Sequence, residues 1–254
     1  MAMEQNIIEE QGFKYVEEGE GEVLMLLHGL FGALSNFYDI LETFKDTHKV
    51  VIPILPLYDL PIDETTVLGF VQYVEKFVAH KGYDKVIVLG NSLGGHIALI
   101  YALQNIDKIK GVVLTGSSGL FESAMGDSYP KRGDYDYIKQ KAELTFYNPE
   151  HASKELVDEL FDIVNDRNKV IRVLATAKSA IRQNLGEELH NITAPTLLIW
   201  GNNDTITPPF VGEEFHKLIP HSRLVFIDKC GHAPMMEQPE LFNQHLREFL
   251  EEIQ

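Results

Sequence analysis

The chain has 254 residues, of which 44% are hydrophobic and 24% are charged, as expected for one large globular domain or for one domain carrying an insertion. Its formal net charge of −16, from 38 acidic and 22 basic residues, argues against nucleic acid or an anionic membrane surface as a partner, because both attract basic patches. The single cysteine, Cys230, excludes an intramolecular disulfide, and the apolar runs are too short to span a membrane.

The first part of the chain predicts strands that alternate with helices. Its opening residues contain neither a basic segment nor an apolar run, so we expect no signal peptide and a cytoplasmic location. Residues 6–10 and 14–17 predict edge strands, whereas the apolar run 23–27 predicts a central strand covered on both faces. The elements expected next are a helix, a strand and an amphipathic helix, at residues 34–44, 49–55 and 65–80.

The middle of the chain repeats this alternation and then breaks it. A strand, a helix and a strand are expected at residues 85–89, 93–103 and 109–114. From residue 119 to residue 190 only helical patterns follow, for example at 152–164 and 169–181, and such a stretch is too long for a connecting loop. We therefore interpret residues 119–190 as a helical cap inserted into an α/β core that comprises residues 1–118 and 191–254.

The alternation resumes after the cap. A strand, a helix, a strand and a closing helix are expected at residues 195–200, 210–218, 223–227 and 241–251. Strands that alternate with helices pair in parallel through right-handed crossovers. The predicted fold class is α/β, with a mostly parallel sheet flanked by helices.

Ser92 occupies a G-x-S-x-G sequence between a buried strand and an apolar helix. Small neighbours let the strand and helix approach at such a corner, and the helix N-terminus favours developing negative charge. An ordinary helix cap is the simpler role for a serine here. The placement of the motif favours a nucleophile.

Asp204 and His232 could activate this serine. A histidine can take the hydroxyl proton, and a carboxylate can fix the tautomer of that histidine. Each residue follows a predicted strand, and the carboxyl ends of parallel strands meet at one edge of a sheet. Singly, either could be a loop residue, but the order Ser92, Asp204, His232 favours a catalytic triad.

The His28-Gly29-Leu30-Phe31-Gly32 loop suits a further role, because it also follows a predicted strand. A tetrahedral intermediate needs hydrogen-bond donors for its oxyanion, and the backbone N–H groups of Leu30 and Leu93 are the candidates. A structural turn is the alternative. Most remaining histidines, His48 among them, are expected at the surface, whereas His96 and Cys230 are expected to pack.

These motifs give the sequence a clear resemblance. LLHGLFG, VLGNSLGG, LLIWGNNDTITPP and CGHAPMMEQPE are similar to segments of the α/β-hydrolase family, and the likeness covers the chain apart from the cap. The nearest groups are bacterial serine carboxylesterases and the carbon–carbon hydrolases that open meta-cleavage products. The resemblance implies a nucleophile at Ser92, an acid at Asp204, a base at His232, and oxyanion donors at Leu30 and Leu93.

Two departures narrow the choice of reaction. Carbon–carbon hydrolases of this family often carry an aromatic residue after the catalytic histidine, whereas Ala233 follows here. Proline iminopeptidases carry HGGPG where this chain has HGLFG, and this difference argues against that activity. A serine nucleophile in turn argues against dehalogenase and epoxide hydrolase chemistry. H-E-x-x-H, a cysteine cluster and a strand-linked G-x-G-x-x-G are all absent, so neither a metal nor a dinucleotide cofactor is expected.

The cap should line the pocket. Arg172 and Arg182 could bind a substrate carboxylate, although solvated cations on a helix face are the simpler interpretation. Apolar cap residues could form a wall of the pocket, although apolar stripes at helical spacing more often belong to the core: Leu144, Phe146, Tyr147, Leu174 and Ile181.

The sequence therefore predicts a cofactor-independent serine hydrolase, a monomer or homodimer, that cleaves small carboxylic esters through an acyl-enzyme on Ser92. Two alternatives stay open. One is a carbon–carbon bond hydrolase of the meta-cleavage-product type, and the other is a hydrolase-like ligand receptor with little turnover.

Overall fold

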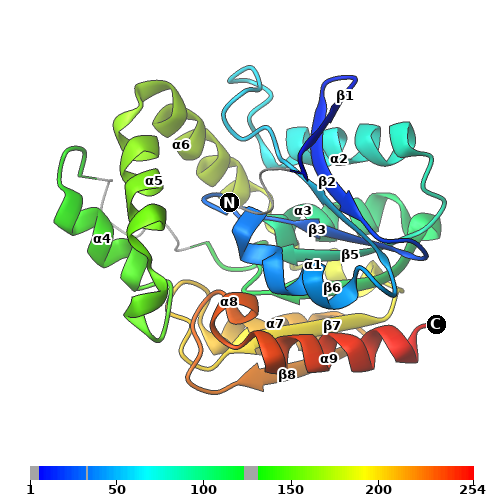
Figure 1. Ribbon diagram of the computed structural model, residues 1–254. Coiled ribbons are helices and arrows are strands. Elements are labelled where there is room, and N and C mark those ends of the chain that lie inside the picture. The colour runs from blue at the N-terminus through cyan, green and yellow to red at the C-terminus, as the bar shows by residue number, and fades with distance from the viewer. Residues whose placement is uncertain (1–5, 33, 123–130) are drawn as a thin grey trace.

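An eight-stranded sheet forms the centre of the molecule in a computed structural model that describes residues 6–32, 34–122 and 131–254 (Figure 1). The strands are β1 (Ile8–Glu10), β2 (Phe13–Glu18), β3 (Val23–Leu27), β4 (Lys49–Pro53), β5 (Val86–Asn91), β6 (Ile109–Thr115), β7 (Thr196–Gly201) and β8 (Ser222–Ile227). Their spatial order is β1-β2-β4-β3-β5-β6-β7-β8. The strands from β4 to β8 in this order pair in parallel, and β2 pairs antiparallel with both β1 and β4. The expectation that residues 14–17 form an edge strand is therefore wrong, because β1 covers the free side of β2.

Nine α-helices and four short 3-10 helices lie in the described part of the chain. The α-helices are α1 (Tyr38–Phe44), α2 (Val67–Lys81), α3 (Leu93–Gln104), α4 (Tyr135–Glu143), α5 (Lys154–Asn165), α6 (Arg167–Arg182), α7 (Pro209–Leu218), α8 (Pro234–Glu237) and α9 (Pro239–Glu252). The 3-10 helices are η2 (Leu34–Phe37), η3 (Ile106–Lys108), η4 (Pro149–His151) and η5 (Leu189–Asn191). Within the described ranges, no helix combines the length and the apolar character that crossing a membrane requires.

Strand β3 shows how the sheet separates two apolar cores. All five of its residues are buried, as the continuous apolar run predicts. Met25 and Leu27 pack in the cluster that includes α2, α3 and α7, whereas Leu24 and Leu26 pack on the other face with α1 and α9. Because successive side chains of a strand point to opposite faces, both helical layers are held by the same short run.

Local signals mark the ends of the helices. At the start of α2, the Thr66 side chain accepts a hydrogen bond from the Gly69 N–H, and Gly82 ends the helix with φ of 67°. Ser153 caps α5 in the same way, and Asp166 caps α6.

Helices α4, α5 and α6 stand to one side of the sheet, in the stretch of chain that joins β6 to β7 (Figure 1). We call residues 131–190, which contain them, the helical insertion. Arg172 ties this insertion to the segment between β4 and α2, because its Nε donates to the Leu60 carbonyl at 3.0 Å. The side chain of Arg182, in contrast, is exposed. The division into a core (1–118 and 191–254) and a cap (119–190) stays a prediction, and residues 123–130 of that cap lie outside the described part.

Several expectations for single residues can be compared with the structure. Leu144, Tyr147 and Ile181 are about half exposed, at 51%, 49% and 58% of their surface. Phe146 is 7% exposed and packs in the α1/α9 core, in agreement with the core alternative for this residue. His48 is also buried, contrary to expectation, because its ring packs edge-on against Phe44 with the centroids 6.2 Å apart.

Candidate active site

Ser92 lies on a sharp corner between β5 and α3. Its φ of 54° and ψ of −119° are rare for a residue with a side chain, and such a conformation costs about 1–3 kcal/mol. The side chain is partly exposed, whereas its neighbours Asn91 and Leu93 are buried. The backbone is thus strained at a residue that remains partly accessible.

The glycines around Ser92 allow three backbones to meet. A Cβ on Gly94 would lie 1.9 Å from the Leu27 carbonyl oxygen of β3, and a Cβ on Gly90 would lie 2.3 Å from the Gly94 oxygen. Both distances are far inside van der Waals contact. The close approach of β3, β5 and α3 therefore requires glycine on both sides of the serine, as the sequence predicts.

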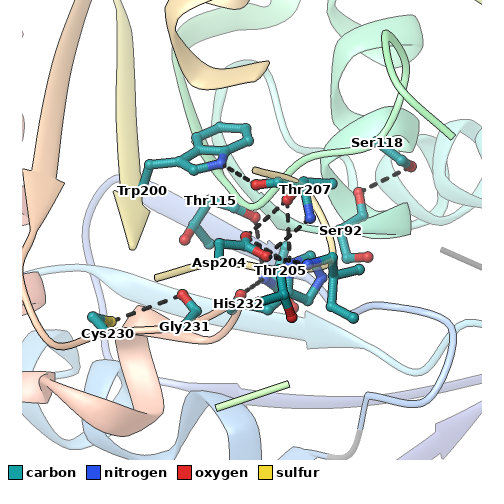
Figure 2. A network of polar contacts seen from close by, with 12 residues as sticks. Ser92, Thr115, Ser118, Trp200, Asp204, Thr205, Thr207, Cys230, Gly231 and His232 are labelled. Atoms are coloured by element: carbon teal, nitrogen blue, oxygen red, sulfur yellow. Dashed lines mark hydrogen bonds and ion pairs between the residues drawn. The ribbon is translucent and has the colours of Figure 1, made fainter. Parts of the chain in front are cut away.

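His232 and Asp204 form a buried hydrogen-bonded pair (Figure 2). The His232 Nδ1 lies 2.9 Å from Asp204 Oδ2, and the two residues are 7% and 3% exposed. The second carboxylate oxygen, Oδ1, accepts from the N–H groups of Ile206 and Thr207 at 2.8 and 2.9 Å, and the Thr207 hydroxyl donates to Oδ2 at 2.8 Å. Because the Nδ1–H group donates a hydrogen bond to Asp204, Nε2 is the ring atom that can accept a proton.

A hydrogen bond joins the corner at Ser92 to the loop that carries His232. The Asn91 side chain donates to the His232 carbonyl at 3.2 Å and to the Thr115 carbonyl at 3.1 Å. Gly116 lies against the imidazole, since a Cβ there would come 2.8 Å from His232 Nδ1. The structure thus brings Ser92, Asp204 and His232 from three separate post-strand loops into one small region, in which Figure 2 shows all three.

The His28–Gly32 loop lies against the same corner. A Cβ on Gly29 would be 3.3 Å from Ser92 Cβ, so the loop backbone passes directly beside the serine. The Gly29 carbonyl accepts hydrogen bonds from the Gly32 N–H at 3.0 Å and from His28 Nδ1 at 2.9 Å. The peptide bond is planar, so fixing this carbonyl also fixes the direction of the Leu30 N–H. Leu93 is the first residue of α3, and its N–H therefore has no acceptor within that helix.

His28 supports the loop in a single tautomer. Its Nδ1 donates to Gly29, and its Nε2 accepts from the Leu55 N–H at 3.0 Å. Burial lowers the pKa of the His28 imidazole below its usual value, which favours the neutral ring that this pair of bonds requires. His28 is thus a structural part of the loop and has no ring nitrogen free for proton transfer.

No individual supporting role was predicted from the sequence for four residues of this region. They are His28, Asn91, Thr207 and Glu237. All four lie inside the motifs LLHGLFG, VLGNSLGG, LLIWGNNDTITPP and CGHAPMMEQPE, so position within these segments was the available signal. Within the described ranges, no three His, Cys, Asp or Glu side chains are grouped closely enough to hold a metal ion.

Comparisons with known families and with solved structures point to the same family. The family model of the alpha/beta hydrolase fold matches residues 22–239. The chain belongs to the alpha/beta hydrolase family. A solved alpha/beta hydrolase enzyme from the metagenome of lagoon sediments at Mar Chica, Morocco, is 44% identical, with a TM-score of 0.81 and coverage of 97% of this chain and 98% of that one.

Two curated relatives of this alpha/beta hydrolase have different reactions in their names. The 2-hydroxy-6-oxo-6-phenylhexa-2,4-dienoate hydrolase of Comamonas testosteroni is 26% identical over 93% of this chain and 90% of its own length. The pimeloyl-[acyl-carrier protein] methyl ester esterase of Neisseria meningitidis serogroup C is 32% identical over 65% of this chain and 70% of its own length. One name describes a dienoate hydrolase and the other a methyl ester esterase.

Proposed function

We propose that this alpha/beta hydrolase is a serine carboxylesterase that acts on small carboxylic esters without a cofactor. The observation that carries the proposal is the buried pair of His232 and Asp204, with 2.9 Å between Nδ1 and Oδ2, beside a serine at a strained corner. A hydrogen-bonded carboxylate and imidazole supply the base that a serine hydroxyl needs to become a nucleophile. The methyl ester esterase among the relatives is consistent with this reaction.

In the proposed first half-reaction, Ser92 Oγ attacks the ester carbonyl carbon, and its proton passes to His232 Nε2. The resulting oxyanion receives hydrogen bonds from the backbone N–H groups of Leu30 and Leu93, each of which can contribute about 3 kcal/mol to transition-state stabilisation. The carbon–oxygen bond to the leaving group then breaks. His232 returns the proton to the departing alkoxide, which leaves as the alcohol, and an acyl-enzyme remains on Ser92.

In the second half-reaction, water attacks the acyl carbonyl and gives a proton to His232. The bond to Ser92 Oγ breaks, and the proton passes from His232 to the serine, so the products are a carboxylic acid and the original enzyme. Asp204 accepts four hydrogen bonds, which hold its carboxylate in place to stabilise the imidazolium in both halves.

A carbon–carbon bond hydrolase is the second candidate. It is favoured by the dienoate hydrolase relative, whose likeness covers 93% of this chain, against 65% for the methyl ester esterase. Ala233, a small buried residue, follows His232 where carbon–carbon hydrolases often carry an aromatic side chain. That difference is why we place ester hydrolysis first.

A panel of substrates separates the two reactions. Purified protein is assayed against nitrophenyl esters of increasing acyl length and against a vinylogous diketone of the meta-cleavage type, with Ser92→Ala as the control. We expect ester turnover that Ser92→Ala abolishes. Diketone turnover far above ester turnover would favour the second candidate, and ester turnover that survives in Ser92→Ala would refute both assignments. A cytoplasmic location and a monomeric or homodimeric state stay predictions.

A further inference from the structure

The loop that carries His232 is bonded directly to the helical insertion. We call residues 144–148, between α4 and η4, the docking segment. The Thr145 carbonyl accepts a hydrogen bond from the His232 backbone N–H at 2.8 Å. The Leu144 carbonyl accepts from the hydroxyl of Thr205, the residue after Asp204, at 3.0 Å. The insertion thus contacts the segments of both the histidine and the aspartate.

Glu237 is the side chain that closes this contact. It belongs to α8, five positions after His232, and it is 8% exposed. Its Oε1 accepts from the N–H groups of Tyr147 and Asn148, both at 2.9 Å. Its Oε2 accepts from the N–H of Gly231 at 2.5 Å. One buried carboxylate therefore holds two N–H groups of the docking segment and the N–H immediately before His232.

The packing around these bonds leaves little freedom. A Cβ on Gly231 would lie 2.6 Å from the Thr145 oxygen and 2.9 Å from Phe146 Cα, so the two backbones are in direct contact. Phe146 fixes the docking segment from the other side, because its ring is buried in the α1/α9 core. Loss of the carboxylate would leave three N–H groups in this contact without their acceptor, and a buried donor without a partner is costly.

We propose that Glu237 is a positioning residue that joins the docking segment and the His232 loop into one unit, so that the placement of the imidazole depends on the docking of the helical insertion. The proposal rests on the proposed function in one respect, namely that His232 is the base. Glu237 would touch no substrate atom. It would act by holding the backbone on both sides of the contact.

Two substitutions at Glu237 separate the two contacts that its carboxylate makes, one with the docking segment and one with the His232 loop. In Glu237→Gln, the amide oxygen satisfies two donors if it faces Tyr147 and Asn148 but only one if it faces Gly231, so the first orientation is favoured. The amide NH₂ then meets the Gly231 N–H, donor against donor. Glu237→Gln should therefore keep the docking segment in place and disturb the histidine loop, whereas Glu237→Ala should release both.

Asn243→Ala provides a matched control. Asn243 is 7% exposed and lies on α9, where its side chain donates to the Asp39 carbonyl at 3.2 Å and to the Thr43 hydroxyl at 2.9 Å. This variant also loses buried hydrogen bonds, but at the junction of α1 with α9. It should lower the free energy of unfolding in urea without changing the kinetics or the spectrum of His232.

The experiment measures kcat and KM for a nitrophenyl ester, together with the far-downfield proton resonance of the His232 Nδ1–H bonded to Asp204. A misplacement of about 1 Å can cost about 100-fold in rate, so we expect Glu237→Gln to lower kcat at least about tenfold with KM within about twofold of wild type. The Nδ1–H resonance should shift or broaden. Glu237→Ala should lower kcat further, by about 100-fold, and raise KM as well.

The positioning role would be overturned if Glu237→Gln kept both the wild-type kcat and an unchanged Nδ1–H resonance. The resonance tests placement of the imidazole without any turnover, so a wild-type protein that hydrolyses no ester would refute the proposed function while the spectrum still decided the role of Glu237. An equal change of the resonance in Asn243→Ala would also overturn the proposal, because it would reduce the effect to a general loss of stability.

Discussion

Asp204→Asn should inactivate the enzyme without unfolding it, and the hydrogen bonds of the carboxylate explain why. Oδ1 accepts from two backbone N–H groups, those of Ile206 and Thr207, whereas Oδ2 faces His232. The single oxygen of an asparagine satisfies more donors at the Oδ1 position, so its NH₂ group occupies the Oδ2 position. There it donates to His232 Nδ1 and forces the ring proton onto Nε2, which can then no longer accept the proton of Ser92.

A histidine held in the wrong tautomer costs about 10⁴-fold in kcat, or about 5.5 kcal/mol of transition-state stabilisation. The loss of fold stability should be much smaller, about 1 kcal/mol, because the hydroxyl of Thr207 can rotate and accept from the new amide. The assay is ester turnover at saturating substrate, with urea unfolding measured in parallel. Asp228→Asn, at an exposed position after β8, is the control and should match wild type in both measurements. A kcat for Asp204→Asn within tenfold of wild type would refute the tautomer argument.

Two further predictions concern the fold around Ser92. Gly94→Ala should destabilise the protein by about 3 kcal/mol in urea unfolding, because the new Cβ would lie 1.9 Å from the Leu27 carbonyl oxygen; unchanged stability would contradict the close packing of α3 on β3. Burial lowers the pKa of His96 from 6.5 to about 4, so the folded state favours the neutral ring and its stability should fall as the pH drops from 6.5 toward 4. This contribution to the free energy of unfolding should reach about 3 kcal/mol near pH 4. The Glu122 carboxylate lies 3.9 Å from the ring. The acid-induced loss of unfolding free energy, measured in urea, should be smaller by that amount in His96→Gln than in wild type. An equal loss in both proteins would show that His96 is not its source.

The sequence predicted the sheet well because its inner strands are short apolar runs. The run that became β3 is buried on both faces, and each strand that follows a helix was placed within a few residues. The prediction for β2 was wrong because the sequence of one strand does not reveal which other strand covers its edge. His48 was misjudged for a related reason, since its polar sequence neighbours conceal the contact with Phe44.

The three residues proposed for catalysis could be predicted because each follows a strand in a parallel sheet, and such positions meet at one edge. The contacts that support these residues could not be predicted from the sequence. Glu237 and Tyr147 are 90 positions apart in the chain, and nothing in either local pattern indicates that a helical insertion would return to the histidine loop. The neutral tautomer of His28 is likewise set by Leu55, a residue that lies 27 positions away.

Identification of the residue that becomes covalently modified is the most direct test of the central claim, the nucleophilic role of Ser92. The protein is treated with a fluorophosphonate, digested, and analysed by peptide mass spectrometry, with Ser92→Ala in parallel. We predict one phosphonyl group on Ser92 of the wild type and no adduct in the variant. An adduct on another residue, or no adduct on a protein that still hydrolyses esters, would contradict the account.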